Sequence, residues 1–334
     1  MAPSVLIRGE GVAACCCAHL LGRSGIPLIV ETADRPRVPA IMLGEATQKL
    51  LSDVFDRRDL FDELPRINKR IVAWGKNSTP IALPHSAVVV SEESLLDRIQ
   101  SGLPRPNPSL DREAAWTIFA SRPLPGSSEE HHFGSRLATA SAVQLKNGCD
   151  PGACWIESLD HGWLFLLPGA GRAWLLSVGD AAATLLSQSR LIAEQIAETS
   201  APRGTFPSHP RILQPLCDPG WLACGTAALG FDPLCGDGTG HAIREAILAS
   251  AVVRAAIDGA DVSALIAHYR TRLLAGFKRH LEACRQFYQA GLSGPWWDQE
   301  LSSLDRGLDW CTRQLERSPG FRFRLSGFAL EAID

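Results

Sequence analysis

Four glycines in the last third of the chain are the residues that most strongly suggest a ligand site. Within residues 221–246, Gly225, Gly236, Gly238 and Gly240 lack the Cβ atoms that would keep the backbone away from a flat ligand. From Gly240 onward apolar residues recur at helical spacing, so we expect a helix that begins at these glycines. Its N-terminus would point free N–H groups and a positive dipole end at the ligand, which suits an electron-rich ring such as a reduced flavin.

A second glycine pattern lies near the start of the chain. A short apolar strand at residues 4–7 leads into Gly9 and Gly11 of a G-x-G-x-x-A sequence, and an apolar helix (12–21) and a second strand (27–30) follow. Glu31 ends the second strand twenty residues after Gly11, where a carboxylate can accept hydrogen bonds from ribose hydroxyls. The full order of strand, helix, strand and acid favours a dinucleotide site over a glycine turn in an ordinary βαβ unit.

Composition excludes several classes of protein. The chain has 334 residues and a formal net charge of −3, with no basic excess to indicate nucleic-acid binding. No apolar run is long enough to span a membrane, and the start lacks the features of an export signal. The ten cysteines contain no CxxC pair, so we expect a reduced, cytoplasmic setting and no metal site. Cys15, Cys16 and Cys17 are interpreted as small packing residues of the first helix.

The order of elements predicts an α/β protein in which two domains interleave. A run of strand candidates between the two glycine segments is typical of an antiparallel sheet, and helices follow from residue 262. We therefore expect a Rossmann-like cofactor domain, an antiparallel-sheet substrate domain and a C-terminal helical region. Their bounds are 1–65 and 215–260 for the cofactor domain, with a helix and loop at 91–115; 66–90 and 116–214 for the substrate domain; and 261–334 for the helices.

Three stretches resemble single-component FAD-binding proteins of the p-hydroxybenzoate hydroxylase fold, especially their tryptophan-halogenase branch. They are the G-x-G-x-x-A segment with Glu31, the sequence L-G-E-A-T at 43–47, and the glycine segment at 225–240. Thr226 stands where this family usually has aspartate, so a hydroxyl replaces one charged contact to the ribityl chain. The resemblance implies FAD as cofactor. The residues expected to bind it are Gly9, Gly11, Val12, Ala13, Ala14, Glu31, Thr32, Glu45, Gly225, Asp232, Gly236, Gly238, Thr239 and Gly240.

Two departures from the halogenases affect the expected chemistry. The halogenase sequence W-x-W-x-I-P is replaced here by W-L-F-L-L-P, so Phe165 stands in place of the second indole after Trp163. The lysine that takes oxidised halide in halogenases has no clear counterpart, because Lys49 and Lys69 are better read as surface lysines. Oxygenation is therefore favoured over halogenation.

Further stretches are most similar to the LodB/GoxB-like flavoproteins encoded beside cysteine tryptophylquinone oxidases. Three stretches of sequence carry this resemblance: R-I-V-A-W-G, S-R-L-I-A and F-D-P-L-C-G-D-G-T-G-H. It implies an FAD-dependent monooxygenase that hydroxylates a tryptophan of a partner oxidase precursor, using O₂ and an external reductant. A flavin-dependent halogenase, a hydroxylase of small aromatic molecules and a non-catalytic maturation partner are the alternatives.

The candidate catalytic residues are fewer and less specific. Trp74, Trp163 and Phe165 either line a substrate pocket or belong to the core. His85 is a candidate proton acceptor, or a structural histidine held by hydrogen bonds.

Two charged residues have structural alternatives as well. Asp237 is expected to cap the helix that follows it. Arg136 is expected either to face the substrate or to pair with a surface acid. No catalytic triad or metal-ligand spacing is visible in the sequence.

Overall fold

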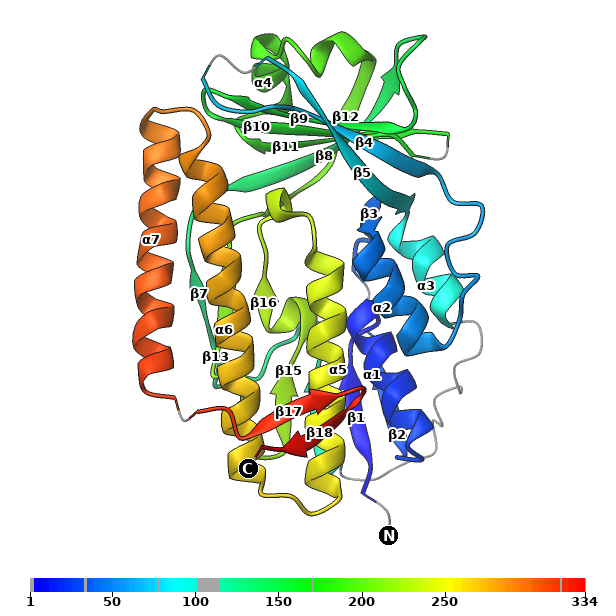
Figure 1. Cartoon of the computed structure of the whole chain (residues 1–334), viewed down its shortest axis with the longest axis vertical. Helices are drawn as coiled ribbons and strands as arrows, with labels where there is room; N and C mark the ends of the chain where they lie inside the picture. The colour runs from blue at the N-terminus through cyan, green and yellow to red at the C-terminus, as the bar shows by residue number, and fades with distance from the viewer. Residues whose placement is uncertain are drawn as a thin grey trace.

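The computed structural model describes residues 3–32, 35–76, 79–100, 114–169, 171–318 and 320–333. A large sheet closes one end of the molecule, and a smaller, mostly parallel sheet with its helices forms the other end (Figure 1). Two long helices, α6 (Val262–Gln289) and α7 (Pro295–Glu316), run side by side from the large sheet along one flank. The loop expected after the helix at 92–100 falls at 101–113, outside the described residues.

The N-terminal glycine pattern forms the predicted βαβ unit. β1 (Val5–Arg8) and β2 (Leu28–Glu31) pair in parallel, and α1 (Val12–Arg23) connects them. Val5 and Ile7 of β1 are fully buried, as expected for a parallel strand that is covered on both faces. Cys15, Cys16 and Cys17 are buried within α1, which confirms their interpretation as packing residues.

The small sheet contains one strand that the sequence placed elsewhere. Its order is β14-β15-β6-β1-β2. β6 (Trp116–Phe119) lies parallel between β1 and β15 (Trp221–Ala223), and β14 (Cys217–Asp218) forms the edge. We expected residues 116–120 to belong to the antiparallel substrate domain, and this was wrong. The short apolar run at 116–120 fits a strand of either sheet, and only its pairing with β1 decides which sheet it joins.

The large sheet has eight strands, and it is mostly antiparallel, as expected from the run of strand candidates. In spatial order they are β12 (Ile196–Pro207), β8 (Leu137–Leu145), β11 (Ala173–Gly179), β10 (Gly162–Leu167), β9 (Ala153–Leu159), β4 (Arg66–Ala73), β5 (Ile81–Val90) and β3 (Ile41–Gly44). All neighbours are antiparallel except β4 and β9, which are parallel. A small third sheet joins β7 (Glu129–His132), β13 (Arg211–Gln214) and β16 (Leu229–Gly230).

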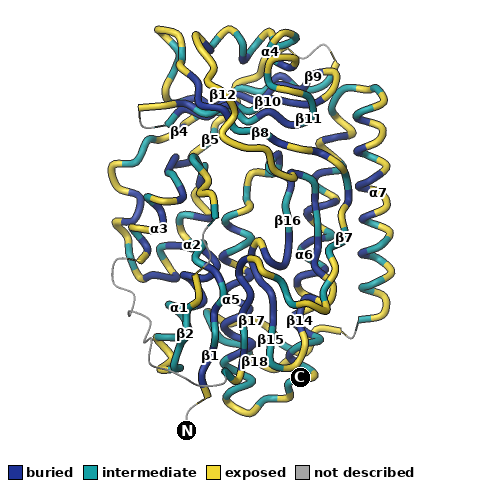
Figure 2. The backbone as a smooth tube through the Cα atoms, turned by 180° about the vertical axis from the view of Figure 1, so that it is seen from behind, coloured by how far each residue is buried: buried dark blue, intermediate teal, exposed yellow. Residues whose placement is uncertain are grey.

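The remaining helices cover the two sheets. They are α2 (Glu45–Phe55), α3 (Glu92–Gln100), α4 (Ala182–Gln188) and α5 (Gly238–Ile257), with short 3₁₀ turns η1 (Ala193–Gln195), η2 (Gly225–Ala227) and η3 (Pro233–Cys235). Seen from behind, α1, α2 and α3 lie on one side of the molecule and α6 and α7 on the other, with buried and exposed residues alternating along α7 (Figure 2).

The C-terminal region is helical only in part. We expected helices alone after residue 261, but the chain ends in a hairpin of β17 (Phe323–Ser326) and β18 (Ala329–Ala332). Figure 1 shows the hairpin in front of α5, and its Phe323 and Leu330 pack against the main core. No helix among the described residues is both long and apolar enough to cross a membrane.

Candidate functional site

The turn between β1 and α1, here called the glycine cradle, could hold an anionic group. Gly9 has φ +134°, and its N–H donates to the Glu31 carbonyl at 2.8 Å. A Cβ atom on Gly9 would lie 2.9 Å from Ser121 Oγ. At Gly11, which precedes α1, no side chain of the described residues caps the helix, and its first turn holds no acid. The first N–H groups of α1 could therefore bind a diphosphate.

A guanidinium group that the sequence did not single out lies over this turn. A Cβ atom on Gly11 would be 3.0 Å from Nη2 of Arg35. Arg35 is held by Glu92, whose Oε2 accepts from Nη1 at 3.0 Å. No motif marks Arg35, since its place depends on Glu92 at the start of α3. Glu92 Oε1 lies 3.8 Å from the same Cβ position, so the pair adds little net charge here, and Arg35 could favour an anion only by turning to it from Glu92.

The acidic residue at the end of β2 is already partly engaged. Glu31 Oε2 accepts from Arg8 Nε at 2.8 Å, and both side chains are exposed. Thr32 follows it and is exposed as well, and Glu45 is exposed at the start of α2. We predicted that Glu31, Thr32 and Glu45 bind a dinucleotide, and these roles stay predictions.

The second glycine segment packs closely against the first. Gly225 has φ +57°, and a Cβ atom there would lie 2.8 Å from Cβ of Ala13 in α1. A Cβ atom on Gly240 would lie 2.7 Å from Oγ1 of Thr47 in α2. Gly236 also has a positive φ, +68°. The glycines are therefore required for close approach of α5 to α1 and α2 and for the turn before α5.

Asp237 does not cap α5 with its side chain, so that prediction was wrong. Its Oδ1 accepts from Thr47 Oγ1 at 2.7 Å, and its Oδ2 accepts from Arg244 Nη1 at 2.7 Å. The carboxylate thus bridges α2 and α5 instead. No acid lies within the first turn of α5, but the Asp237 carboxylate lies beside it, since its Oδ1 is the atom nearest to where a Cβ atom of Gly240 would be.

One face of the large sheet, here called the aromatic face, carries Trp163 and Phe165, which we predicted as site residues, and Arg70, which we did not. Phe165 pairs with Ile156, and Arg70 pairs with Cys154 two residues earlier on the same strand. Residues that pair directly, or that lie two apart on a strand, share one face of a sheet. Trp163, Phe165 and Arg70 therefore point to the same side. Lys69, one residue before Arg70, points to the other.

Arg70 connects this face of the sheet to the glycines at 236–240, here called the glycine loop. Its Nη2 lies 3.3 Å from Nε2 of His85 and 4.0 Å from where a Cβ atom of Gly236 would be. The Nε of Arg70 is buried and has no hydrogen-bond partner among the described residues. Burial, and secondly the positive charge of Arg70, lower the pKa of His85. The structure thus brings His85 and the glycine loop together through a residue that we did not predict.

The two tryptophans are fixed by hydrogen bonds. Trp163 is fully buried, and its Nε1 donates to the hydroxyl of Tyr288 on α6 at 3.1 Å. Trp74 donates from Nε1 to the carbonyl of Phe287 at 2.8 Å and meets Trp297 edge-on at 5.6 Å. Both are anchored where the large sheet meets α6 and α7, so they are parts of a rigid wall.

Asp232 lies at the centre of a buried polar network. Its carboxylate accepts from Tyr288 at 2.9 Å and from Leu234 N–H at 2.9 Å, and it pairs with Arg136 at 2.9 Å. Arg136 also pairs with Glu300 of α7, and all three charged side chains are buried. Burial alone would lower the pKa of Arg136, but the acidic groups around it raise it. The expectation of a substrate contact or a surface partner for Arg136 was wrong. The carboxylate of Asp232 is taken up by this network.

Comparison with solved structures identifies the fold, whereas no protein-family model and no curated protein matches the sequence. The peptidyl tryptophan dihydroxylase QhpG, described as essential for tryptophylquinone cofactor biogenesis, superposes with a TM-score of 0.77 at 17% identity, over 100% of this chain and 86% of its own. The flavin-dependent halogenase CmlS gives 0.74 at 17% identity, over 95% and 72%. HpxO of Klebsiella pneumoniae, as a single-residue variant complexed with FAD, gives 0.61 at 15% identity, over 95% of each chain. This is the fold of flavin-dependent hydroxylases and halogenases.

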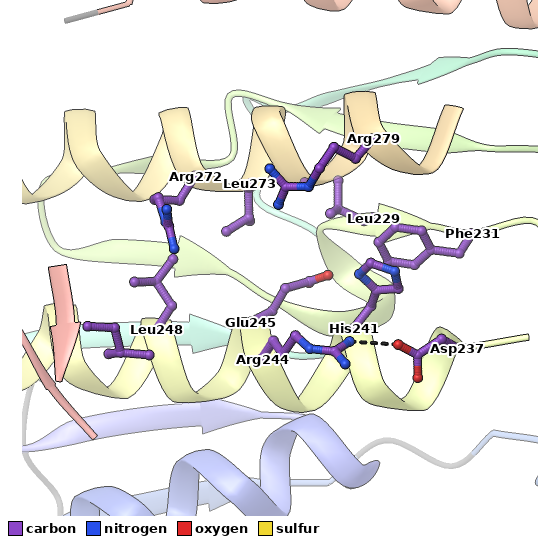
Figure 3. A pocket seen from close by; sticks show the side chains of 12 residues that line it. Leu229, Phe231, Asp237, His241, Arg244, Glu245, Leu248, Arg272, Leu273 and Arg279 are labelled. Carbon is purple, nitrogen blue, oxygen red and sulfur yellow. Dashed lines mark hydrogen bonds and ion pairs between the residues drawn. The ribbon is translucent and has the colours of Figure 1, made fainter. Parts of the chain in front are cut away.

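A separate cavity of about 400 Å³ lies between α5 and α6 of this flavoprotein-like fold (Figure 3). Arg272 and Arg279 reach it from α6, while Arg244 and Glu245 reach it from α5. Burial raises the pKa of Glu245 to about 8, although the hydrogen bond from Gly225 N–H opposes this. The cavity is on the α6 side of α5, whereas Gly240 and Gly225 face α2 and α1. Its guanidinium groups suit an anion, but it is not the glycine cradle.

Proposed function

We propose that this chain is an FAD-dependent monooxygenase that hydroxylates a tryptophan side chain in a partner oxidase precursor. The modified residue would become part of a tryptophylquinone cofactor. The observation that carries the proposal is the position of Arg70 and His85, which lie on the aromatic face of the large sheet next to Gly236.

The residues of the two glycine segments fit FAD. Gly9, Gly11 and the first turn of α1 would hold the diphosphate, and Glu31 would accept from the ribose. Gly236, Gly238 and Gly240 would let the backbone before α5 come close to the ring system. The unpartnered Nε of Arg70 supports a polar ligand group at the junction of sheet and glycine loop. When bound, FAD takes electrons from an external reductant and activates O₂ for transfer to an aromatic ring.

The chain's own contribution is to aim the substrate and to handle a proton. A guanidinium can only donate, so His85 accepts from Arg70 at Nε2 and carries its proton on Nδ1. Burial and Arg70 lower the pKa of His85 and so keep the imidazole neutral at neutral pH. When Arg70 turns to a substrate oxygen, Nε2 of His85 is free to accept the proton that the hydroxylated ring releases.

Trp163 is fully buried and belongs to the core, and Phe165, which it supports, would exclude water and orient an indole. Trp163 cannot turn away without losing its hydrogen bond to Tyr288, so the wall keeps its shape. Phe165 lies two residues further on the same face and is half-buried. Flat apolar surfaces of this kind pack against an aromatic substrate, and close placement of the reacting carbon dominates the rate.

The lysines that we considered for halogenation are on the outside of the molecule. Lys69 pairs with Asp150 at 2.6 Å, with each side chain 41% exposed, and lies on the face opposite to Arg70. Lys49 pairs with Asp53 on the exposed side of α2. Neither can deliver halogen to the aromatic face, and this favours oxygenation over halogenation.

The peptide nature of the substrate is supported by two resemblances. One is the sequence likeness to flavoproteins encoded beside tryptophylquinone oxidases, and the other is the fold shared with a peptidyl tryptophan dihydroxylase at 17% identity. The test is co-expression of the partner oxidase gene with and without this chain, followed by intact-mass analysis of the oxidase. We expect the mass of one or two oxygen atoms on a tryptophan only when this chain is present. Equal oxygen gain without it would refute the proposal, and chlorine or bromine on that residue would establish halogenation.

A non-catalytic maturation partner is the second candidate, and Thr226 motivates it. Thr226 is exposed and supplies no carboxylate; its Oγ1 donates to the Ala120 carbonyl at 3.4 Å. A partner that has lost tight FAD binding would still support oxidase maturation when Gly11→Trp removes the cradle. A monooxygenase would not.

A further inference from the structure

Three side chains that are far apart in the sequence meet beside the glycine loop. Cys235 lies in η3, between Asp232 and Gly236, while His280 and Cys284 lie one turn apart on α6. The two sulfurs are 3.4 Å apart, and Cys284 Sγ is 3.3 Å from His280 Nε2. All three ligand atoms lie within 4.8 Å of one another. No sequence motif marks this group, since 44 residues separate Cys235 from the His-x-x-x-Cys pair.

We propose that Cys235, His280 and Cys284 bind one Zn²⁺ ion. Two thiolates and one imidazole are a donor set that zinc takes in tetrahedral geometry. Cys284 is fully buried and Cys235 is half-buried, so water can reach the ion as the fourth ligand from the side of Cys235.

The spacing is closer to that of a metal site than to that of a disulfide. Zinc–sulfur bonds of about 2.3 Å and zinc–nitrogen bonds of about 2.0 Å place tetrahedral ligands roughly 3.5–3.8 Å apart. The observed separations of 3.4 and 3.3 Å need to open by only a few tenths of an ångström. A disulfide of about 2.05 Å would instead need the sulfurs to close by more than an ångström.

The charges also balance in this buried place. Binding releases one proton from each thiol to solvent, and Zn²⁺ with two thiolates and a neutral imidazole carries no net charge. The neighbouring Asp232, Arg136 and Glu300 network therefore meets no new buried charge. The Asp232 N–H, which now donates to His280 Nε2 at 2.9 Å, would turn to a thiolate sulfur when the ion takes that nitrogen.

The ion would tie the glycine loop to α6. Gly236 follows Cys235 at once and is the residue next to Arg70. This role concerns the order of the loop and does not depend on the reaction proposed above, because metal binding is measured without FAD or substrate.

The test is metal binding by the full-length, untagged chain under reducing conditions. We expect one Zn²⁺ per chain by equilibrium dialysis. Co²⁺ should give the thiolate-to-metal absorption and the visible bands of a tetrahedral site. Cys235→Ser and Cys284→Ser should each weaken binding by at least about a hundredfold, because the loss of a direct ligand exceeds the effect of an outer-shell change. Cys311→Ser is the matched control, since Cys311 is a fully buried thiol on α7 outside the group.

Circular dichroism separates a lost site from a lost fold. Cys235 is only half-buried, so its serine variant should keep the far-ultraviolet spectrum of the unmodified chain. Failure of the reduced, folded chain to bind stoichiometric Zn²⁺ or Co²⁺ would overturn the proposal. So would binding that survives both ligand variants. Ready formation of a Cys235–Cys284 disulfide in a chain that binds no metal would assign the pair to thiol redox chemistry instead.

Discussion

Glu245 gives the sharpest test of the packing around the second glycine segment. It lies in α5 with only 6% of its surface exposed, and its Oε2 accepts from the N–H of Gly225 at 2.7 Å. The other oxygen, Oε1, is buried without a hydrogen-bond partner among the described residues. Replacement by glutamine keeps the shape and an acceptor for Gly225 but removes the charge.

The size of the effect follows from the raised pKa. Burial raises the pKa of Glu245 from 4.5 to about 8. Below pH 4.5 the carboxyl is protonated in both the folded and the unfolded chain, so its ionisation does not change the free energy of unfolding. As the pH rises, the unfolded chain ionises first, and the free energy of unfolding falls until about pH 8. At about 1.4 kcal/mol per pKa unit, the full loss is roughly 5 kcal/mol, an upper bound because the folded chain can relax.

The assay is urea denaturation across the range from weakly acidic to weakly alkaline pH. The difference in unfolding free energy between Glu245→Gln and the unmodified chain should grow with pH by several kcal/mol and level off above about pH 8. Glu282→Gln, at an exposed position on α6, is the control and should give a difference that does not change with pH. Parallel pH profiles for Glu245→Gln and the unmodified chain would show that the carboxyl is solvated and the reasoning is wrong.

Three further outcomes test the cofactor and substrate sites. Gly11→Val should weaken FAD binding by at least about a hundredfold in a fluorescence titration. The new side chain would fill the proposed diphosphate position, and its Cβ would lie 3.0 Å from Nη2 of Arg35. Unchanged affinity would exclude this turn as the diphosphate site. Thr226→Asp, at an exposed position, should tighten FAD binding by restoring the carboxylate of the family, and a weaker complex would contradict that role. Arg70→Met should reduce modification of the partner tenfold or more while Lys69→Met, on the opposite face, leaves it unchanged; equal effects of the two would remove Arg70 from the site.

The local glycine patterns were sufficient to predict the strands and helices at the two ends of the proposed cofactor site. The strand, turn and helix around Gly9 and Gly11 are contiguous, so their geometry follows from spacing alone, and the structure has them as β1, α1 and β2. The helix after Gly240 was predicted for the same reason, and it begins at Gly238. The interleaved α/β fold with its antiparallel sheet was also confirmed, but three predictions that needed contacts between distant segments were wrong. The parallel place of β6, the partners of Arg136 and the hairpin at the C-terminus all depend on contacts between distant segments.

The sequence by itself determined a glycine turn between a strand and a helix, an apolar α/β core and the replacement of the second halogenase indole by Phe165. Only the tertiary structure decided which side chains meet. Arg70 and Phe165 share a face because β4 pairs in parallel with β9, and β9 in turn pairs with β10. Cys235 reaches α6 because η3 packs against that helix. Periodicity determines which face of an element is apolar, but the register between distant strands and helices is set by packing, and register decides which polar groups stand together.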